Sequence, residues 1–335
     1  MKIGILSPVA WRTPPRHYGP WEQMASNLTE GLIASGMEVT LFATGDSITA
    51  GKLDSVIEAG YEEDRNLDAK VVECLHISNL MEKASSFDLI HNHYDFLPLS
   101  YSRLIKTPII TTIHGFSSPK IIAVYEKYNK SSSYVSISDS NRSSRLEYLA
   151  TIYNGIQTCN FSFVENAEEY LLFFGRIHPD KGTLEAIEIA EKTKRKLIIA
   201  GIVQDQGYFK EHIEPRLNDQ IVFVGSAGPV ARNELLGKAS ALLHPINFDE
   251  PFGLSVAEAM LCGTPVIAFN RGSMPELISD GQTGFLVDNV EMAADAVNNI
   301  SSIERRTCHT WANDKFSSEK MVADYISLYK QIVQR

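Results

Sequence analysis

Two glutamates, Glu250 and Glu258, are separated by seven residues and bracket a Pro-Phe-Gly turn, after which a helix is expected to begin near Leu254 or Ser255. The free N–H groups and the positive dipole end of a helix start favour an anion such as a phosphate. Carboxylates beside that start can accept hydrogen bonds from hydroxyl groups. The stretch therefore predicts a site for a diphosphate attached to sugars, although two isolated glutamates are more often solvated surface residues.

A second polar group follows the apolar run from Leu171 to Gly175. Arg176 and Lys181 lie in the loop between this expected strand and a helix that is expected to begin at Thr183. Two cations placed together can neutralise the two charges of a departing nucleoside diphosphate without a metal ion. Their predicted role is stabilisation of a leaving group, and the alternative for isolated basic loop residues is a solvated surface position.

Three motifs resemble those of the retaining family-four glycosyltransferases, also called glycosyl transferases group 1. The stretch from Asp249 to Met260, with its Gly-x-Pro-Val continuation, resembles the donor-site signature of this family. The frame from Gly175 to Gly182 resembles its diphosphate-binding loop, and the Thr-x-His-Gly frame around His114 is similar to a motif of its N-terminal domain. The resemblance implies an α/β protein with the GT-B fold, in which two Rossmann-like, doubly wound parallel-sheet domains face a cleft.

The resemblance also implies a reaction. Such an enzyme would move a glucose- or mannose-like hexose from a UDP- or GDP-sugar to a hydroxyl acceptor, with retention of configuration and without a metal ion or other cofactor. Glu250 would hold the hydroxyls of the donor sugar, Glu258 would hold those of the ribose, and His114 would reach the sugar near its reacting carbon. The residues expected to act in catalysis are His114, Glu250, Arg176 and Lys181. Those expected to bind the donor are Gly19, Gly175, Arg176, Lys181, Gly225, Ser226, Glu250, Phe252, Gly253, Leu254 and Glu258.

The loop after the first expected strand departs from the family pattern of two adjacent glycines. Gly19 would let backbone N–H groups approach a phosphate, but Pro20 replaces the second glycine and removes one donor. This loop and the loop over residues 94–98 would build the acceptor pocket. The candidate acceptor residues are Trp11, Tyr94 and Arg142. A saccharide, a small molecule or a lipid-linked compound is the expected acceptor.

His91 and His93 flank another expected strand end, at a spacing that could suit a metal ion. No third ligand is apparent in the sequence, and protein zinc sites need three or four. We therefore expect these histidines to form a substrate-facing rim or to have a hydrogen-bonded structural role, and we expect no metal site.

The elements that must position these residues follow from apolar runs that alternate with helical spacing. Strand, helix and strand repeat along the first half, so the strands should be parallel and ligands should lie beyond their carboxyl ends. The alternation restarts after the first half with five further expected strands. This predicts an N-terminal acceptor-binding domain over residues 1–154 and a C-terminal donor-binding domain over 155–316. Spacing predicts a final helix over 317–335, and the resemblance alone implies that it crosses back onto the N-terminal domain.

Composition narrows the partners of this 335-residue chain. A net charge of −10 and a pI near 5.4 argue against nucleic acid, and against more than peripheral contact with an anionic membrane. The four scattered cysteines form no Cys-x-x-Cys pair, which argues against a zinc site and a disulfide framework. No charged-then-apolar leader and no run of about 20 apolar residues is present, so a soluble cytoplasmic protein is expected.

Three other functions compete with glycosyl transfer. A nicotinamide dehydrogenase needs a Gly-x-Gly-x-x-Gly turn after a strand, and neither domain's first strand is followed by one. A non-catalytic periplasmic sugar-binding protein would carry an export leader. A sugar-nucleotide epimerase or a glycosyl phosphorylase on the same fold stays an open alternative. Release of a nucleoside diphosphate that depends on a second sugar would separate the transferase from both.

Overall fold

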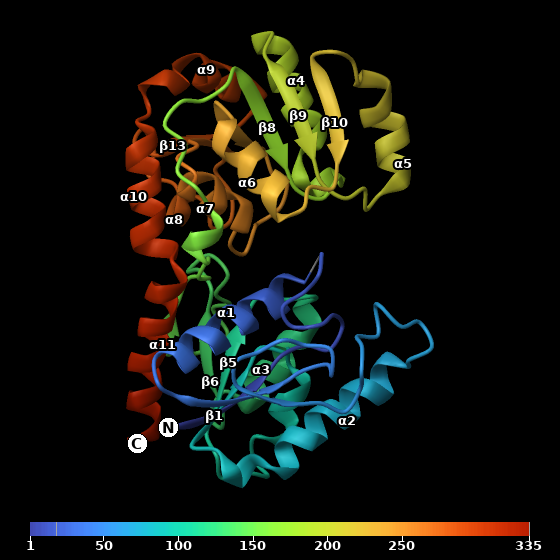
Figure 1. The fold of residues 1–335 in the computed structure, drawn as a ribbon, viewed down its shortest axis with the longest axis vertical. Coiled ribbons are helices and arrows are strands. Elements are labelled where there is room, and N and C mark those ends of the chain that lie inside the picture. Colours follow the sequence, from blue (N-terminus) through green and yellow to red (C-terminus); the bar gives the residue numbers. More distant parts are fainter. Residues whose placement is uncertain (18, 335) are drawn as a thin grey trace. The chain divides into compact units, whose positions relative to one another are not determined.

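The computed structural model describes residues 1–17 and 19–334, which form two compact units. Unit 1 contains residues 1–155 together with the segment from Ser318 onward, and unit 2 contains residues 156–317. Each unit is built around one sheet in which every neighbouring pair of strands is parallel (Figure 1). This confirms the predicted fold class of two Rossmann-like domains.

The described residues of unit 1 form a seven-stranded sheet with the order β3-β2-β1-β4-β5-β6-β7. Its strands are β1 (Lys2–Leu6), β2 (Glu38–Phe42), β3 (Lys52–Asp54), β4 (Leu89–Asn92), β5 (Ile109–Ile113), β6 (Ser133–Ser136) and β7 (Ala150–Thr151). Its helices are α1 (Pro20–Ala34), α2 (Ala69–Glu82), α3 (Ile122–Tyr128) and α11 (Ser318–Val333). The short strands β3 and β7 were not predicted, because the sequences Lys-Leu-Asp and Ala-Thr are too short to show an apolar pattern.

Helix α11 packs against α1 within unit 1. The two helices approach closely at Gly31, where an added Cβ atom would lie 2.3 Å from Val322 Cγ2. Six residues on the apolar face of α11 are buried in the core that also contains β1: Met321, Val322, Tyr325, Leu328, Tyr329 and Ile332. The helix therefore contributes both apolar surface and two tyrosine hydroxyls to unit 1.

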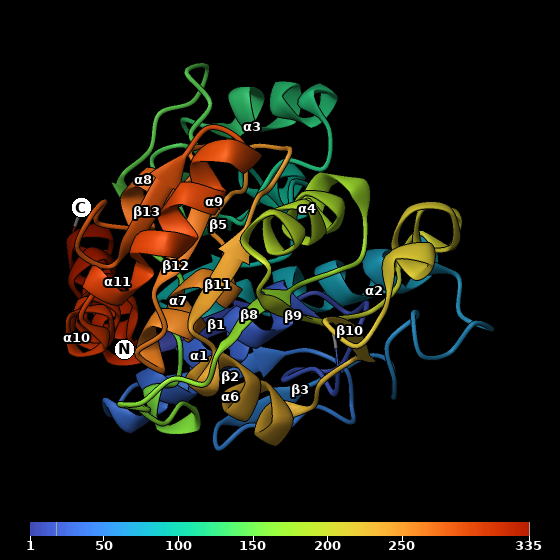
Figure 2. The same ribbon diagram turned by 90° about the horizontal axis from the view of Figure 1, so that it is seen from above.

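The described residues of unit 2 form a six-stranded sheet with the order β10-β9-β8-β11-β12-β13, which can be followed across Figure 2. Its strands are β8 (Tyr170–Phe174), β9 (Lys196–Ala200), β10 (Ile221–Gly225), β11 (Ala241–His244), β12 (Val266–Phe269) and β13 (Gly284–Val287). Its helices are α4 (Thr183–Thr193), α5 (Gln206–Tyr208), α6 (Pro229–Lys238), α7 (Leu254–Leu261), α8 (Met274–Leu277), α9 (Val290–Asn299) and α10 (Arg305–Phe316). The prediction of five strands was wrong by one, because the four-residue strand β13 was overlooked.

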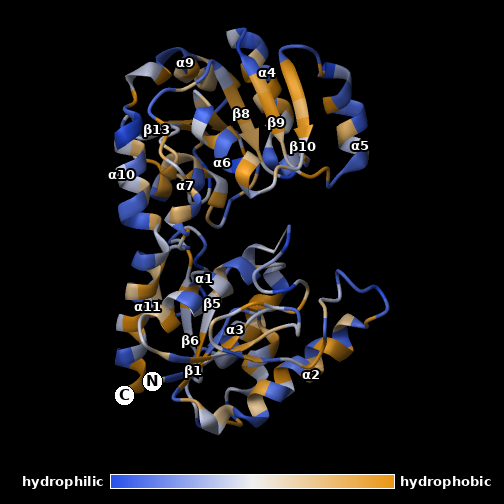
Figure 3. Cartoon of the chain, viewed as in Figure 1, coloured by the Kyte–Doolittle hydropathy of each residue, from blue (hydrophilic) through white to orange (hydrophobic). Residues whose placement is uncertain are grey.

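The sheet of unit 2 brings distant loops to one edge. Strands β8, β11 and β12 are almost wholly buried, and Figure 3 shows the strands of this unit as mainly hydrophobic beside helices with hydrophilic faces. Because all six strands are parallel, their carboxyl ends lie at the same edge. The loops that begin after Phe174, Gly225 and His244 therefore meet there.

Three expectations from composition can be compared with the described residues. All four cysteines are unpaired, with Cys74 and Cys159 exposed and Cys262 and Cys308 buried. Within residues 1–17 and 19–334, no three His, Cys, Asp or Glu side chains are grouped so that they could hold a metal ion. Over the same residues, no helix has the length and apolar character needed to cross a bilayer. That the reaction needs no metal ion stays a prediction.

Candidate functional site

The turn before helix α7 is held in place by the chain that follows β12. Gly253 adopts a φ of +93° at the N-cap of α7, where the helix begins at Leu254 as predicted. Ser273 fixes the turn from behind, because its backbone N–H donates to Glu250 O over 3.0 Å and its Oγ donates to Phe252 O over 2.6 Å. The first N–H groups of α7 and the carboxylate of Glu250 are thus positioned by one rigid loop.

Glu250 and Lys181 are brought into contact at the carboxyl edge of the unit 2 sheet. Lys181 Nζ donates to Glu250 Oε2, and the two side chains are only 14% and 13% exposed. The ammonium group also lies 4.6 Å from the centroid of the Phe248 ring. The pair therefore places one cation and one carboxylate side by side in a largely desolvated position, where electrostatic interactions are stronger than in water.

The loops that carry this pair are joined to each other. Gly182, with a φ of +74°, approaches the neighbouring loop so closely that an added Cβ atom would lie 1.8 Å from Pro245 O. Asn247 N–H donates to Asp180 O over 2.7 Å across the same contact. A side chain at position 182 would push the two loops apart and move Lys181 away from Glu250. The position of Lys181 therefore requires glycine at residue 182.

His244 lies next to the pair and was not among the predicted site residues. Its Nε2 atom is 3.8 Å from Glu250 Oε2, and its side chain is 6% exposed. Burial, with a further contribution from the charge of Lys181, lowers the pKa of His244 to about 3, so the ring is neutral near pH 7. The residue ends strand β11, and the rule that led to His114, a polar residue at a strand end, could have found it.

Arg176, Gly175, Gly225 and Ser226 lie at the same edge. Gly175 and Arg176 follow β8, and the Arg176 guanidinium donates from Nη1 to Gln204 Oε1. Gly225 ends β10 with a φ of +76°, and Ser226 after it is exposed. The structure therefore brings these four predicted donor residues to the sheet edge at which Lys181 contacts Glu250.

Glu258 faces an arginine that the sequence did not single out. Glu258 is 7% exposed in the second turn of α7, and its Oε1 atom lies 3.3 Å from Arg232 Nη1 of α6. Burial raises the pKa of Glu258 to about 7, and the charge of Arg232 acts in the opposite direction. The Arg232 guanidinium also stacks 5.3 Å from the centroid of the Phe161 ring. Glu258 is therefore a buried, arginine-paired carboxylate and not a solvated surface residue.

His114 occupies the end of β5 in unit 1. It is 6% exposed, its ring stacks on Trp21 with centroids 5.6 Å apart, and its Nε2 atom lies 3.0 Å from His93 Nδ1. Burial lowers the pKa of His114 to about 3, so this ring is also neutral near pH 7. His114 can therefore offer one donor and one acceptor, but it is a poor base.

His91 has a hydrogen-bonded structural role, which was one of the two predicted alternatives; the other was a place on a substrate-facing rim. Its Nδ1 atom lies 2.5 Å from Tyr329 Oη, and its Nε2 atom lies 2.7 Å from Thr112 Oγ1. Thr112 Oγ1 is in turn 2.6 Å from Tyr325 Oη. Both ring nitrogens of His91 are thus used, which leaves neither free for a metal ion.

The other predicted residues of unit 1 lie in different surroundings. Gly19 is buried at the N-cap of α1 with a φ of +153°, and Tyr18 beside it lies outside the described residues. Tyr94 is 6% exposed and belongs to a hydrophobic core, so its ring offers no open face on which a sugar could stack. Trp11 is half-buried. Arg142 is exposed, and its Nε atom lies 3.4 Å from Asp139 Oδ1.

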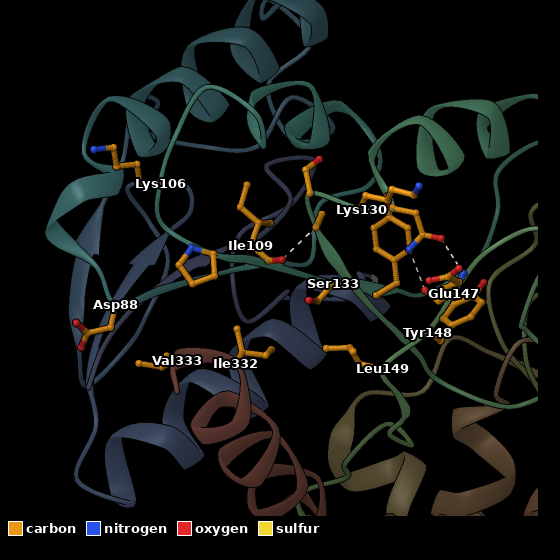
Figure 4. A pocket seen from close by; sticks show the side chains of 15 residues that line it. Asp88, Lys106, Ile109, Lys130, Ser133, Glu147, Tyr148, Leu149, Ile332 and Val333 are labelled. Carbon is orange, nitrogen blue, oxygen red and sulfur yellow. Dashed lines mark hydrogen bonds between the residues drawn. The ribbon is translucent and has the colours of Figure 1, made fainter. Parts of the chain in front are cut away.

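A cavity of about 690 Å³ in unit 1 lies away from these residues (Figure 4). Its lining comes from the chain just before and at the start of β4, β5 and β6, from the chain just before β7 and from the end of α11, as shown by Asp88, Ile109, Ser133, Leu149 and Val333. These are the amino ends of the strands, whereas ligands of parallel sheets bind beyond the carboxyl ends. None of the predicted site residues lines this cavity, and we assign it no role.

Comparison with known proteins identifies the family of unit 2. Residues 159–315 match the family described as glycosyl transferases group 1. An uncharacterised glycosyltransferase of Methanocaldococcus jannaschii is 23% identical to the chain, and the alignment covers 98% of each protein. An uncharacterised 41.2 kDa protein from the cps region of Klebsiella pneumoniae is 34% identical over 185 residues, which are 52% of this chain and 50% of that protein.

A solved structure extends the likeness of fold to both units. The Anabaena protein HepE, crystallised with UDP-glucose, is 18% identical and superposes with a TM-score of 0.72 over 99% of this chain and 100% of that one. At this identity the likeness concerns the fold. Together with the sheet topology it confirms the fold that the motifs predicted. Residues 159–315 therefore belong to the glycosyl transferases group 1 family, and the chain has the GT-B fold.

Proposed function

We propose that the protein is a retaining hexosyltransferase that moves a glucose- or mannose-like sugar from a UDP- or GDP-sugar to a hydroxyl group of a saccharide or glycoconjugate. The observation that carries this proposal is the contact between Lys181 and Glu250 beside the start of α7. It combines a cation and helix N–H groups, which suit a diphosphate, with a carboxylate, which suits sugar hydroxyls. HepE, which has the same fold, was crystallised with UDP-glucose, and this supports a nucleotide-sugar donor.

On the donor side, Lys181 and Arg176 would neutralise the departing diphosphate, so that the reaction needs no metal ion. The backbone N–H groups at residues 252–254 would share that load. Glu250 would accept hydrogen bonds from the transferred sugar, and Glu258 would accept them from the ribose. Each such charge-assisted bond is worth about 1.5–3 kcal/mol.

On the acceptor side, we assign unit 1 the binding of the second substrate, with Trp11 and Arg142 as the candidate contacts. His114 would contact the sugar that is transferred. Neither His114 nor His244 is basic enough to take a proton near pH 7, because burial lowers the pKa of each ring to about 3. The acceptor hydroxyl would therefore lose its proton to an oxygen of the departing phosphate, on the same face of the sugar.

The test begins with donor binding. The protein is mixed with a panel of UDP- and GDP-hexoses, and thermal unfolding is recorded for each. A donor at a hundred times its Kd should stabilise the folded state by about 2.7 kcal/mol. A panel without any stabilised member would contradict the proposal.

The second step identifies the reaction. The stabilising donor is incubated with a set of saccharide acceptors, and nucleotide release and the anomeric configuration of the product are measured. Release that depends on the acceptor, with an unchanged anomer, is expected. Conversion of the donor sugar without an acceptor would indicate an epimerase, and a requirement for inorganic phosphate would indicate a phosphorylase.

A further inference from the structure

Three buried histidines stand together at the carboxyl ends of β4 and β5. His91, His93 and His114 are at most 6% exposed, and the rings of His91 and His93 have centroids 4.1 Å apart. Burial lowers the pKa of all three rings well below the ordinary value, so each is neutral near pH 7. A neutral imidazole carries one N–H and one bare nitrogen, and its hydrogen-bond partners decide which is which.

The hydrogen bond between His93 Nδ1 and His114 Nε2 allows two arrangements of the protons. In the first, His93 Nδ1 donates and its Nε2 atom is a bare acceptor. In the second, His93 Nδ1 accepts and its Nε2 atom carries a proton. Among the described residues, His93 Nε2 is buried and has no hydrogen-bond partner, so the second arrangement would bury an unpaired N–H donor.

Buried N–H groups without a partner are rarer in native proteins than acceptors that are not fully used. The first arrangement is therefore the stable one, with the proton on Nδ1 of His93. Since His114 Nε2 must then accept this proton's hydrogen bond, His114 carries its own proton on Nδ1.

The surroundings hold both rings in these orientations. Trp21 stacks on His114 with an interplanar angle of 22°. On the other side of the pair, the ring of His91 lies against that of His93 and is itself fixed by Tyr329 and Thr112. A rotation of His93 that broke its bond to His114 would have to displace this packed group.

We propose that His93 is a positioning residue that fixes His114 as the Nδ1–H tautomer, so that His114 donates a hydrogen bond from Nδ1 to a sugar oxygen. The sugar contact rests on the proposed function, whereas the tautomer does not. In this role His114 recognises a lone pair of a hydroxyl or ring oxygen and takes no proton from the substrate.

The tautomer can be read directly by NMR. The 335-residue protein is labelled with 15N at its histidine rings, and long-range 1H–15N correlations are recorded for the wild type, His93→Asn and His93→Asp. His114 is expected as the Nδ1–H tautomer in the wild type and in His93→Asn, because the asparagine amide can donate in place of Nδ1. His93→Asp has nearly the same shape as His93→Asn but offers only acceptor oxygens when ionised, so His114 is expected to donate from Nε2 and to shift toward the Nε2–H form.

His76→Gln is the matched control, because His76 is also a buried histidine of unit 1 but bonds to Ser7 O over 2.9 Å and not to His114. The control should leave the His114 signals unchanged. Thermal unfolding of each variant shows whether it is folded. An Nε2–H tautomer of His114 in the wild type, or an unchanged tautomer in a folded His93→Asp, would overturn the proposal.

Kinetics separates this proposal from the proposed function. With an active donor and acceptor, His93→Asp should lower kcat by about 10- to 100-fold with little change in KM, and His93→Asn should restore most of it. Loss of activity with no rescue by asparagine would contradict the positioning role. A wild-type protein without transfer activity would contradict the proposed function, and the NMR result would still decide the tautomer.

Discussion

Unit 1 and unit 2 both gather polar side chains at the carboxyl ends of a parallel sheet, but the two sets differ in charge. In unit 1 the group consists of neutral rings and hydroxyls, with His91, His93 and His114 hydrogen-bonded to one another or to Thr112 and Tyr329. In unit 2 the group is built around ion pairs, Lys181 with Glu250 and Arg232 with Glu258, and the neutral ring of His244 lies beside Glu250. Similar sheets thus present different chemistry at the same edge.

This difference matches the division of labour that we propose. Charged side chains suit the diphosphate and the hydroxyl groups that surround it, whereas neutral buried rings can select uncharged hydroxyls without attracting other ions. The two groups also differ in how their charge depends on pH. His114 has a lowered pKa and does not titrate near pH 7, whereas Glu258 does. Four experiments test this contrast.

Loss of the Lys181–Glu250 pair should have the largest effect. Lys181→Ala and Glu250→Gln should each lower kcat by about 100- to 1000-fold, because each removes a group that stabilises the departing or transferred part of the donor. Steady-state kinetics with an active donor measures the loss. Lys192→Ala is the matched control, since Lys192 pairs with Glu291 over 3.1 Å on the exposed surface. A Lys181→Ala variant whose kcat is within tenfold of the wild-type value would contradict the role of Lys181 in stabilising the departing diphosphate.

Donor affinity should depend on pH through Glu258. Since burial raises the pKa of Glu258 to about 7, the ionised form that accepts ribose hydroxyls is lost as the pH falls below 7, and Kd should rise by about tenfold per pH unit. Arg232→Gln removes the charge that lowers this pKa, so the midpoint should move to higher pH. Calorimetric titration with a nucleotide sugar between pH 6 and pH 8.5 measures both. Glu258→Gln should bind weakly at every pH, and an unchanged pH dependence in that variant would assign the titration to another group.

His76 is a neutral buried histidine that has no part in the proposed reaction, so it should affect stability rather than activity. Burial lowers the pKa of His76 from 6.5 to about 4, so between these values the unfolded chain binds a proton that the folded protein does not. The free energy of unfolding should therefore fall as the pH falls from 6.5 toward 4, with His76 contributing about 1.4 kcal/mol per pH unit.

Urea denaturation of the wild type and His76→Gln at pH 6.5 and pH 5 measures this contribution as a difference. Glu22, whose pKa burial raises to about 7, titrates with the opposite sign but is present in both proteins and cancels. The wild type should lose more stability than the variant over this interval. Equal losses would mean that His76 is protonated in the folded protein.

The smallest effect is expected at Gln204. Its side chain accepts a hydrogen bond from Arg176, so Gln204→Ala should leave the guanidinium less ordered and raise the donor KM by about threefold. Steady-state kinetics at varied donor concentration measures this change. Asn218→Ala, in a loop at the other end of β10, is the control. An unchanged KM would mean that Gln204 does not order Arg176.

Much of the fold could be predicted because apolar runs separated by helical spacing are local signals. The start of α7 at Leu254 could also be predicted, since a Pro-Phe-Gly turn marks it. Residues that meet only through packing could not. Arg232 faces Glu258 because α6 and α7 lie side by side, and no spacing in the sequence encodes that contact.

The same reason explains the histidine pair. His93 and His114 meet because β4 and β5 are neighbours, with His91 opposite Ile110 and Asn92 opposite Thr111, and periodicity does not give the strand order. Tyr94 shows the reverse error, because its place in a loop predicted a contact with the acceptor while its ring belongs to the core. His244 was not among the expected site residues, although it ends the buried strand β11.

The close approach of α1 and α11 at Gly31 and Val322 affects the order in which the two units can complete their cores during synthesis. The ribosome synthesises the whole of unit 2, residues 156–317, before it reaches α11, the helix that covers the core of unit 1. Until α11 is made, the apolar side of β1 and α1 in the nascent unit 1 lacks its cover. For that interval, the earlier half of the chain exposes apolar surface that is prone to aggregation.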